Sequence, residues 1–465
     1  MTPTLSNLHF SSTALKPELC ENLVSLGYQE MTAIQAQSIP AILSGKDVIA
    51  QGKTGSGKTA AFSLGLLHHL DVKRFRVQAL VLCPTRELAD QVAKEIRRLA
   101  RAIHNIKVLT LCGGTPMGPQ IGSLEHGAHI IVGTPGRIED HLRKGRLNID
   151  ELNTLVLDEA DRMLEMGFEP ALELIFSLCP KQRQNLLFSA TFPKKIKELT
   201  EHIMSEPVMV KVASTHDHSS IVQHFYQVDD NDQRAEVVEH LILANQPEST
   251  VIFCNTKAET QELADSLKRN GFSCAALHGD LEQRDRDQTL ICFTNKSVNI
   301  LVATDVAARG LDVDNLDMVI NYHLARDPEI HVHRIGRTGR AGGKGMACSL
   351  ISHKEAHKII KLEEYLGQSI TAEDLPTLPS NARPQQAAMV TLQIDGGKKQ
   401  KLRPGDILGA LTANKAIAGD SIGKIQISAI SAYVAIKSDV ANVALKIITN
   451  GKLKGKNFRV RKLTL

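Results

Sequence analysis

Short apolar runs alternate with helix-like segments through the first part of the chain. Between the runs, segments such as residues 86–102 repeat apolar positions at helical spacing. Strands that alternate with helices are typical of βαβ units, so the pattern predicts an α/β domain whose parallel sheet is covered on both faces. We expect its strands at 48–50, 79–83, 108–111, 130–132, 154–157, 185–188 and 208–212.

The same alternation then returns and predicts a second α/β domain. Its strands are expected at 251–254, 274–277, 300–302, 318–320 and 346–351. A break at 375–387, rich in Pro, Ser, Asn and Gln, precedes a third pattern. The order there is βαββαβ, that of an RNA-recognition module, with strands at 389–394, 422–427, 433–437 and 458–463 and helices at 404–411 and 440–449.

These breaks divide the chain into three domains and two linkers. We predict domains at 1–212, 221–370 and 387–465, with linkers at 213–220 and 371–386. A length of 465 residues agrees, because it exceeds what one ordinary core contains.

Composition narrows the class of protein. The hydrophobic fraction is 42% and the charged fraction 23%, as in a soluble globular protein. The N-terminal residues do not begin with basic residues followed by an apolar stretch, as a signal peptide would. The sequence also contains no apolar run long enough to span a membrane. We therefore expect a cytoplasmic protein.

Charge is distributed unevenly. The net charge is +4, yet the tail from Gln386 carries fourteen Lys and Arg against four Asp, which leaves the rest of the chain mildly acidic. A basic tail favours binding of a polyanion, and a merely solubilising surface is the alternative.

The segment from Gly52 to Thr59 fits GxxxxGK[ST] and follows an apolar, strand-like run. Its residues Gly55, Ser56 and Gly57 predict a loop whose backbone N–H groups cradle phosphates. Lys58 is suited to the β- and γ-phosphates, and the Thr59 hydroxyl to Mg²⁺. The alternative is an ordinary Gly/Ser-rich turn.

A pair of acids follows the apolar run at 154–157. Such a position is the carboxyl-end edge of a sheet, where ligands of open α/β folds bind. Asp158 is suited to anchor Mg²⁺, directly or through water, and Glu159 to orient and deprotonate an attacking water. Taken alone, the pair is more often a helix N-cap.

In the second domain, Arg337 and Arg340 are three residues apart, which places them on one face if the segment is helical. Two guanidiniums in a glycine-punctuated segment are suited to reach γ-phosphate oxygens as arginine fingers. A solvated basic turn is the alternative.

Together these motifs resemble those of the DEAD-box ATP-dependent RNA helicases, over about residues 10–367. The tetrapeptide from Asp158 to Asp161 is DEAD. Further motifs occur in the order of that family: Gln35 with Phe10 upstream, 52–59, 84–88, 113–114, 134–137, 189–191, 251–255, 283–286, 303–312 and 333–340.

The resemblance implies two tandem RecA-like domains that bind ATP with Mg²⁺ and hydrolyse it. Phe10 stacks on adenine by this resemblance, and Gln35 binds the edge of the base. The remaining implied nucleotide contacts are Thr32, Gly310 and Asp312; the implied coupling residues are Asp161, Ser189, Thr191 and His333; and the implied RNA contacts are Arg86, Gly114, Thr134, Arg137, Arg284 and Thr304. Such contacts reach phosphates and 2′-hydroxyls and read no sequence.

The tail therefore has to supply specificity. Its segment 431–436 occupies the place of the aromatic-rich strand of an RNA-recognition module, yet only Tyr433 is aromatic there. We infer that the tail reads RNA through another face and its lysines. Segments 394–399 and 403–406 resemble one bacterial branch of the family, which implies a 23S rRNA hairpin as target and a role in large-subunit assembly.

Two other functions remain open. The first is a protein that clamps RNA without hydrolysing ATP. The presence of Lys58, Glu159 and Arg337 argues against this function, because catalysis needs these residues. The second is a DNA helicase or DNA-translocating ATPase. We expect a monomer, because no heptad seam is evident.

Overall fold

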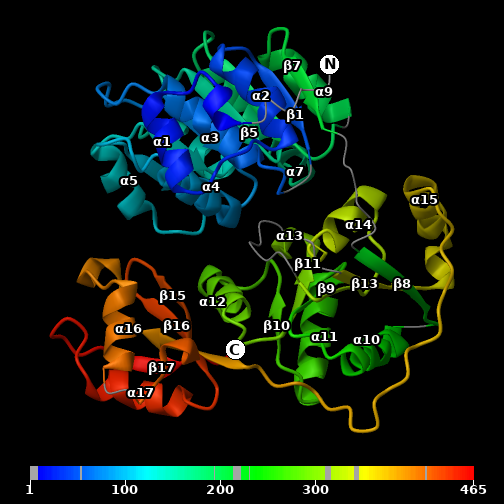
Figure 1. Cartoon of the computed structure of the whole chain (residues 1–465). Helices are drawn as coiled ribbons and strands as arrows, with labels where there is room; N and C mark the ends of the chain where they lie inside the picture. The colour runs from blue at the N-terminus through cyan, green and yellow to red at the C-terminus, as the bar shows by residue number, and fades with distance from the viewer. Residues whose placement is uncertain are drawn as a thin grey trace. The chain divides into compact units, whose positions relative to one another are not determined.

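The computed structural model describes residues 9–52, 55–192, 194–212, 221–229, 231–308, 316–339, 345–413 and 416–465. The chain divides into two compact units, residues 1–215 and 216–465. The first unit contains one parallel sheet, and the second contains a parallel and an antiparallel sheet (Figure 1). The linker predicted at 213–220 lies outside the described residues.

The first unit is built on a seven-stranded parallel sheet of order β3-β4-β2-β5-β6-β1-β7. Its strands are β1 (Val48–Gln51), β2 (Ala79–Leu82), β3 (Val108–Leu111), β4 (Ile130–Gly133), β5 (Thr154–Asp158), β6 (Gln184–Ser189) and β7 (Val208–Lys211). Its helices are α1 (Pro17–Ser25), α2 (Ala33–Leu43), α3 (Lys58–His69), α4 (Arg86–Leu99), α5 (Met117–Glu125), α6 (Pro135–Arg143), α7 (Ala160–Glu165), α8 (Glu169–Leu178) and α9 (Lys194–Ile203), after a 3₁₀ turn at Phe10–Ser12.

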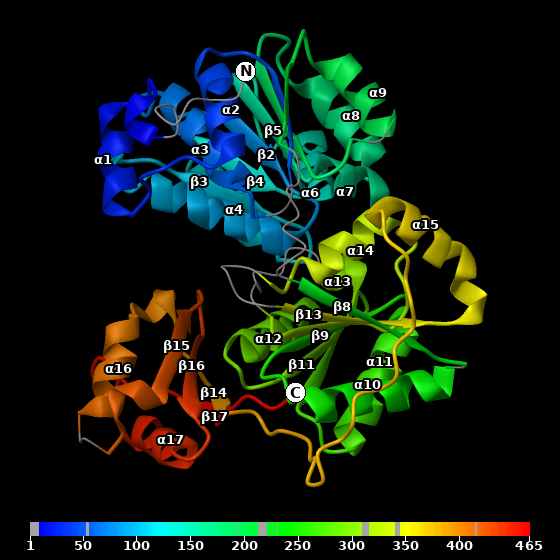
Figure 2. The ribbon, with the colours of Figure 1, turned by 45° about the vertical axis from the view of Figure 1, so that its right-hand side comes forward.

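Two cores bury the faces of this sheet. Val81 packs with apolar residues of α1 to α4, whereas its neighbours Leu80 and Leu82 pack with α6 to α9. This alternation arises because successive strand residues point to opposite faces. Both faces are thus covered, as the sequence predicts (Figure 2).

The second unit contains a six-stranded parallel sheet of order β10-β11-β9-β12-β13-β8. Its strands are β8 (Ile221–Gln227), β9 (Thr250–Cys254), β10 (Cys274–Leu277), β11 (Ile300–Thr304), β12 (Met318–Asn321) and β13 (Gly345–Ile351). Its helices are α10 (Asn231–Asn245), α11 (Lys257–Arg269), α12 (Gln283–Thr294), α13 (Asp305–Ala308), α14 (Pro328–Ile335) and α15 (Ala356–Leu366). Sequence reasoning missed β8, an edge strand whose polar Gln223 and His224 dilute its apolar pattern.

Helices again cover this sheet. Leu241 of α10 and Leu267 of α11 share one core, whereas Phe293 of α12 and Ala307 of α13 belong to the other. No described helix is long and apolar enough to cross a bilayer.

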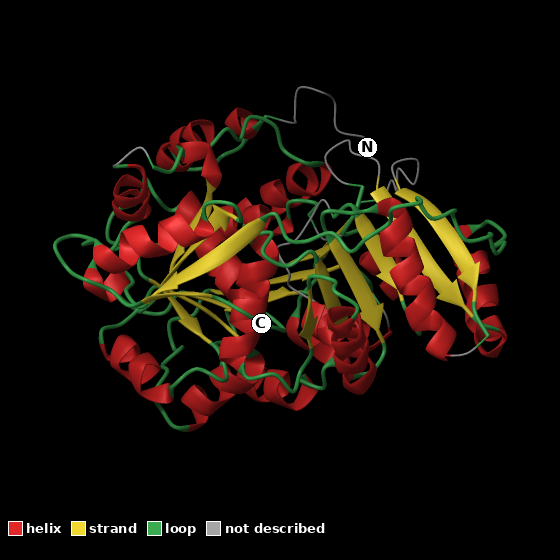
Figure 3. Cartoon of the chain, turned by 90° about the horizontal axis from the view of Figure 1, so that it is seen from below, coloured by secondary structure: helices red, strands yellow, loops and turns green. Residues whose placement is uncertain are grey.

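The C-terminal part of the second unit is a four-stranded antiparallel sheet of order β15-β16-β14-β17. Both of its helices pack on one face, with Ile407 and Ile448 in the same core as Leu392 and Val434 (Figure 3). The predicted βαββαβ order is confirmed, with β14 (Met389–Ile394), α16 (Pro404–Thr412), β15 (Ile422–Ile427), β16 (Ala432–Lys437), α17 (Ala441–Asn450) and β17 (Val460–Lys462).

The other face of this sheet is buried too. Thr391 is 0% exposed and Gln393 4% exposed, although neither points toward α16 and α17. The Thr391 hydroxyl accepts a hydrogen bond from Asn295 Nδ2 at 3.1 Å and lies 2.6 Å from Ser297 Oγ, just past the end of α12. Helix α12 and the residues that follow it therefore cover this face within the second unit.

Residues 371–386, predicted as a linker, make hydrogen bonds to the parallel-sheet part of the unit. Glu373 N donates to Phe225 O at 2.7 Å, and Gln246 Nε2 donates to Arg383 O at 3.2 Å. The segment thus follows the surface of the second parallel domain, while the exact domain boundaries stay predictions.

Candidate active site

The loop before α3 has the backbone that a phosphate cradle needs. Gly55 and Gly57 have φ of +80° and +97°, in the left-handed region that glycine adopts without strain. Lys58, the first residue of α3, is only 6% exposed, and its Nζ donates to Gly52 O at 2.6 Å. The side chain thus folds back over the loop; residues 53 and 54 lie outside the described part.

Gln35 connects the start of α2 to this loop. Its Oε1 accepts from Thr32 N at 2.8 Å, and its Nε2 donates to Gly57 O at 3.0 Å. A Cβ on residue 57 would lie 2.5 Å from Gln35 Nε2, so glycine is required there by space as well as by backbone angle. The predicted base-binding residues Thr32 and Gln35 are therefore brought to the phosphate loop.

Phe10 occupies a different setting. It is 2% exposed, and its ring meets that of Tyr28 edge to face, with centroids 6.2 Å apart. The side chain belongs to the first core. Its predicted stacking on adenine needs an exposed ring face, and that role stays a prediction.

Asp158 ends β5 and is 3% exposed. Burial raises the pKa of its carboxyl to about 7, against the opposing effect of the Lys58 ammonium. Glu159 follows with φ of +53°, a left-handed backbone that is uncommon for residues other than glycine. Both acids are thus buried at the carboxyl-end edge of the sheet, where Asp158 is 3% and Glu159 9% exposed.

Asp161 joins this acidic turn to the end of β6. Its Oδ2 accepts from Thr191 N at 3.0 Å and from Thr191 Oγ1 at 2.9 Å. The carbonyl of Ser189 accepts from Gly52 N at 3.0 Å, so β6 also holds the phosphate loop. These contacts bring together three residues predicted to couple nucleotide state to motion.

The site fits a phosphate ligand that carries a divalent cation. Buried Ser56 Oγ and Ser189 Oγ have no hydrogen-bond partner among the described residues, and such atoms are costly to leave unpaired. Within that part of the chain no cluster of three His, Cys, Asp or Glu forms a ready-made metal site. A cation held by Thr59 and Asp158 therefore needs phosphate oxygens and water to complete its shell.

The predicted RNA contacts of the first unit lie at the carboxyl ends of β2, β3 and β4. Arg86 packs so closely on Gly114 that a Cβ there would overlap the guanidinium. Thr134 Oγ1 accepts from Gly113 N at 3.3 Å, and Arg137 Nη1 donates to Thr115 O at 3.1 Å. The four residues are thus gathered at one edge.

In the second unit, Thr304 ends β11, and exposed Arg284 lies in the first turn of α12. His333 is in the last turn of α14, which ends at Ile335. Arg337 thus lies beyond the helix, and the helical arrangement considered for Arg337 and Arg340 is wrong at Arg337. Arg340, Gly310 and Asp312 lie outside the described residues.

Sequence reasoning missed Arg334, which is 2% exposed. Its guanidinium donates to both oxygens of Asp305, at 2.6 and 2.7 Å, and to His323 O at 2.8 Å. Further bonds reach the amide oxygens of Asn255 and Asn321. One side chain thus ties the ends of β9, β11 and β12 together beside His333.

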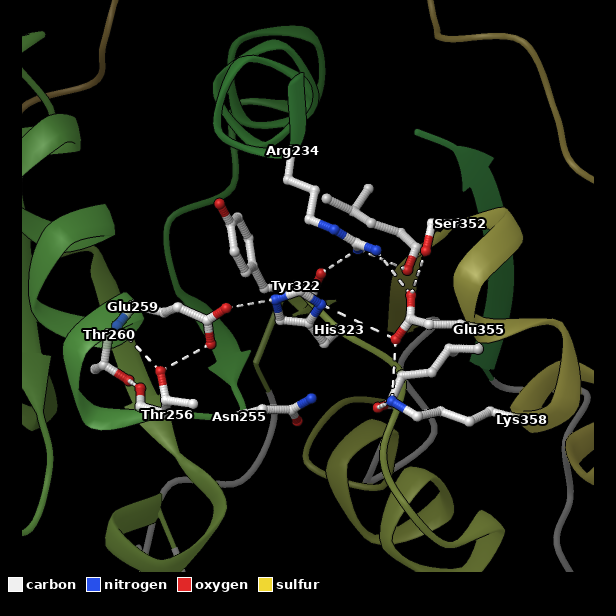
Figure 4. A network of polar contacts seen from close by, with 12 residues as sticks. Arg234, Asn255, Thr256, Glu259, Thr260, Tyr322, His323, Ser352, Glu355 and Lys358 are labelled. Carbon is white, nitrogen blue, oxygen red and sulfur yellow. Dashed lines mark hydrogen bonds and ion pairs between the residues drawn. The ribbon is translucent and has the colours of Figure 1, made fainter. Parts of the chain in front are cut away.

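A second network surrounds His323 at the same edge (Figure 4). His323 Nε2 lies 2.9 Å from Glu259 Oε1, and Arg234 pairs with Glu355 at 2.7 Å. Burial and nearby Arg234 lower the pKa of His323, so the ring is neutral near pH 7. The network holds α10, α11 and α15 to the strand ends.

Comparisons with known proteins agree with this geometry. Residues 32–199 match the DEAD/DEAH box helicase family, and residues 233–342 match the helicase conserved C-terminal domain. Residues 391–462 match the DbpA RNA binding domain. The chain belongs to the DbpA branch of the DEAD-box helicases. DbpA is also the branch that segments 394–399 and 403–406 resemble.

Relatives of full length support the assignment. The chain is 52% identical to the ATP-dependent RNA helicase DbpA of Escherichia coli (strain K12), over 97% of this chain and 98% of that protein. It is 36% identical to DbpA of Bacillus subtilis (strain 168), over 98% and 99%. The protein is therefore an RNA-dependent ATPase and an ATP-dependent RNA helicase.

Solved structures resemble the parallel-sheet domains. Dbp5 of S. cerevisiae bound to RNA and ADP BeF3 matches with a TM-score of 0.70 and 30% identity, over 78% of this chain and 95% of that one. Mss116p bound to ssRNA and AMP-PNP matches with a TM-score of 0.70 and 28% identity, over 80% and 79%. The predicted pair of RecA-like domains with a small third domain is confirmed.

Proposed function

We propose that the protein hydrolyses ATP with Mg²⁺ in the first unit and uses the cycle to remodel 23S rRNA during large-subunit assembly. The observation that supports the ATP site is that Lys58 folds back over the phosphate loop and acts electrostatically on Asp158. The Ser56 hydroxyl of the same loop is buried and has no hydrogen-bond partner among the described residues. Gln35 and Thr32 bind the base edge beside it.

The chemistry follows from the positions of the acids. Thr59 and Asp158 would hold Mg²⁺, which would supply positive charge against that of the phosphates. Glu159 orients the attacking water and takes its proton. Arg337 and Arg340, with Gly310 and Asp312, approach the nucleotide from the second domain when the domains close.

RNA is the ligand that favours closure. Arg86, Gly114, Thr134 and Arg137 hold the backbone on one domain, and Arg284 and Thr304 hold it on the other. Closure bends one strand and melts a few base pairs, and hydrolysis reopens the domains. Asp161, Ser189, Thr191 and His333 couple the two events.

The C-terminal domain directs the enzyme to its target. Support comes from the basic surplus of the tail and from the family match at residues 391–462. E. coli DbpA, 52% identical, is named an ATP-dependent RNA helicase. We propose that a 23S rRNA hairpin is read here and that the enzyme works as a monomer in the cytoplasm.

The test is ATP turnover with matched activators. Large-subunit rRNA should stimulate turnover strongly, and DNA of equal sequence should not, because the core contacts 2′-hydroxyls. Turnover indifferent to RNA would contradict the proposal, and equal activation by DNA would favour a DNA helicase.

Truncation after Pro384 separates the two parts of the proposal. The shortened protein should keep RNA-dependent turnover but lose its preference for rRNA over unrelated RNA, since the basic tail is gone. The measurement is the activation constant for each RNA. If the preference persisted, the tail would not be the reader.

A further inference from the structure

The guanidinium of Arg137, a predicted RNA contact, is held by the loop that follows β3. Its Nη1 and Nη2 donate to Thr115 O at 3.1 and 3.2 Å. A guanidinium carries five N–H groups in one plane, so two bonds to a single carbonyl fix its direction and leave other donors for a phosphate. The position of Thr115 O therefore determines where Arg137 points.

Gln120 of α5 holds the same loop from inside the domain. Its side chain is only 7% exposed, and its Nε2 donates to Cys112 O at 3.0 Å and to the Thr115 hydroxyl. The Thr115 hydroxyl donates in turn to Cys112 O at 2.9 Å. Both ends of the turn 112–115 are thus bonded to one amide group.

The direction of that amide is set by His141, which lies one helical turn after Arg137 in α6 and is 0% exposed. His141 Nε2 lies 3.0 Å from Gln120 Oε1. Because Cys112 O can only accept, the NH₂ end of the Gln120 amide must face it, and Oε1 must accept from the imidazole. The proton of the neutral ring is therefore on Nε2.

The surroundings of His141 favour this one form of the ring. Burial and nearby Arg137 lower the pKa of His141, so the ring is neutral near pH 7. Its Nδ1 is buried and has no hydrogen-bond partner in the described part of the chain, so a second proton would find no acceptor there. Helix α6 is thus attached to segment 112–120 at two points, one through Arg137 and one through His141.

We propose that Gln120 and His141 are positioning residues that aim Arg137 at the RNA backbone. His141 orients the Gln120 amide, the amide fixes the turn 112–115, and Thr115 O directs the guanidinium. Both side chains are buried, so they act on RNA only through Arg137. The inference rests on the proposed function, in which Arg137 holds the RNA. The alternative is a purely structural chain that satisfies the buried carbonyl of Cys112.

The first test is Gln120→Met in the full-length protein, which removes three hydrogen bonds without changing charge. The 23S rRNA transcript concentration that gives half-maximal ATP turnover should rise about fivefold to tenfold, since hydrogen bonds of this kind contribute about that factor each. Turnover at saturating RNA and the KM for ATP should stay at wild-type values, because only RNA binding is weakened. An unchanged RNA requirement would overturn the proposal.

The matched control is Gln78→Met. Gln78 is 2% exposed and lies just before β2, at the sheet edge opposite to the predicted RNA contacts. Its Nε2 donates to Asp71 O and Arg74 O at 2.8 and 2.7 Å, and its Oε1 accepts from Asp71 N at 3.0 Å, so it also loses three bonds. Both variants should lose similar stability in urea, but Gln78→Met should keep the wild-type RNA requirement. Equal rises in that requirement would indicate destabilisation alone and overturn the proposal.

The salt dependence of RNA binding shows whether Gln120 acts through Arg137. Loss of one phosphate contact lowers the slope of log affinity against log salt by about 0.8, and Gln120→Met should show this decrease although it removes no charge. The double variant Arg137→Ala with Gln120→Met should bind the transcript no more weakly than Arg137→Ala alone. An unchanged slope, or losses that add, would overturn the proposal.

Substitutions at His141 test which ring nitrogen carries the proton. His141→Gln places an amide NH₂ at the reach of Nε2 and should keep an RNA requirement close to wild type. His141→Asn reaches only the position of Nδ1, and His141→Leu has no donor, so both should behave like Gln120→Met. Wild-type behaviour of the Asn and Leu variants would overturn the role of His141.

Failure of the proposed function would look different. Wild-type turnover that the 23S rRNA transcript does not stimulate would defeat the proposed function itself. Stimulated wild-type turnover, with a wild-type RNA requirement in Gln120→Met and His141→Leu, would defeat the positioning role alone.

Discussion

Both parallel sheets carry polar side chains at the carboxyl ends of their strands, but the two edges satisfy those groups in different ways. In the first unit, the buried hydroxyls of Ser56 and Ser189 have no hydrogen-bond partner among the residues that the structure describes. Asp158 is buried with a raised pKa. At the second edge, Arg334 makes hydrogen bonds to five oxygen atoms of four residues at or just after the strand ends.

This difference in hydrogen bonding indicates that the first edge binds a ligand, whereas the Arg334 network of the second edge has a structural role. Buried polar groups are normally paired, and the two hydroxyls that lack a partner among the described residues beside the phosphate loop can bond a ligand there. A saturated network has no such capacity, and its value is to fix geometry. The first edge is thus prepared for phosphates, whereas the second holds the backbone that carries His333 and Arg337.

The largest expected effect is a loss of ATP turnover when a residue of the first edge is substituted. Lys58→Ala should lower ATP turnover by about 10³-fold or more and weaken nucleotide binding, because its cation faces the phosphates. Glu159→Gln should bind ATP and RNA but stall before hydrolysis. Steady-state turnover and nucleotide titration measure both.

The matched control is Lys73→Ala, an exposed lysine of the same unit, which should behave as wild type. Wild-type turnover in Lys58→Ala would contradict the site. Loss of nucleotide binding in Glu159→Gln would show that the role of this residue is misassigned.

Substituting Arg334 at the second edge should mainly lower the stability of the folded protein. Arg334→Ala leaves Asp305 without its partner and should lower the free energy of unfolding by about 3 kcal/mol. Exposed Arg269→Ala should change it by less than about 0.5 kcal/mol. Urea unfolding compares the two, and similar values would show that Arg334 is not a structural hub.

The smallest effect is a pH dependence of the first edge, which arises from Asp158. The pKa of Asp158 is raised from 3.8 to about 7, so the folded protein gains stability from its protonation below pH 4 and loses that stability as pH rises through 7. Cation binding needs the carboxylate, so affinity for Mg²⁺ and nucleotide should fall up to tenfold per pH unit below 7. Calorimetry at pH 6 and 8 tests this, and Asp158→Asn should abolish the dependence.

Local patterns predicted much of the molecule. The first sheet, the glycine loop and the acids after β5 follow from apolar runs and spacing within short windows. The role of Arg334 had no such signal, because its partners come from the ends of three strands far apart in sequence. The same holds for Thr391, whose burial depends on Asn295 and Ser297 nearly a hundred residues earlier.

Two departures have local causes. β8 escaped prediction because polar Gln223 and His224 separate its two apolar pairs, so the strand shows neither a continuous apolar run nor a regular alternation. α14 ends at Ile335, just before Gly336, and glycine is a poor residue for continuing a helix. Arg337 therefore lies outside the helix, and helical spacing does not describe its position relative to Arg340.

The amide of Gln35 fills the space that any side chain at position 57 would occupy. A larger residue at 57 would displace this amide and break the hydrogen bond that it donates to Gly57 O. Descendants of this gene should therefore keep glycine at position 57, because its left-handed φ disfavours other residues whatever stands at position 35.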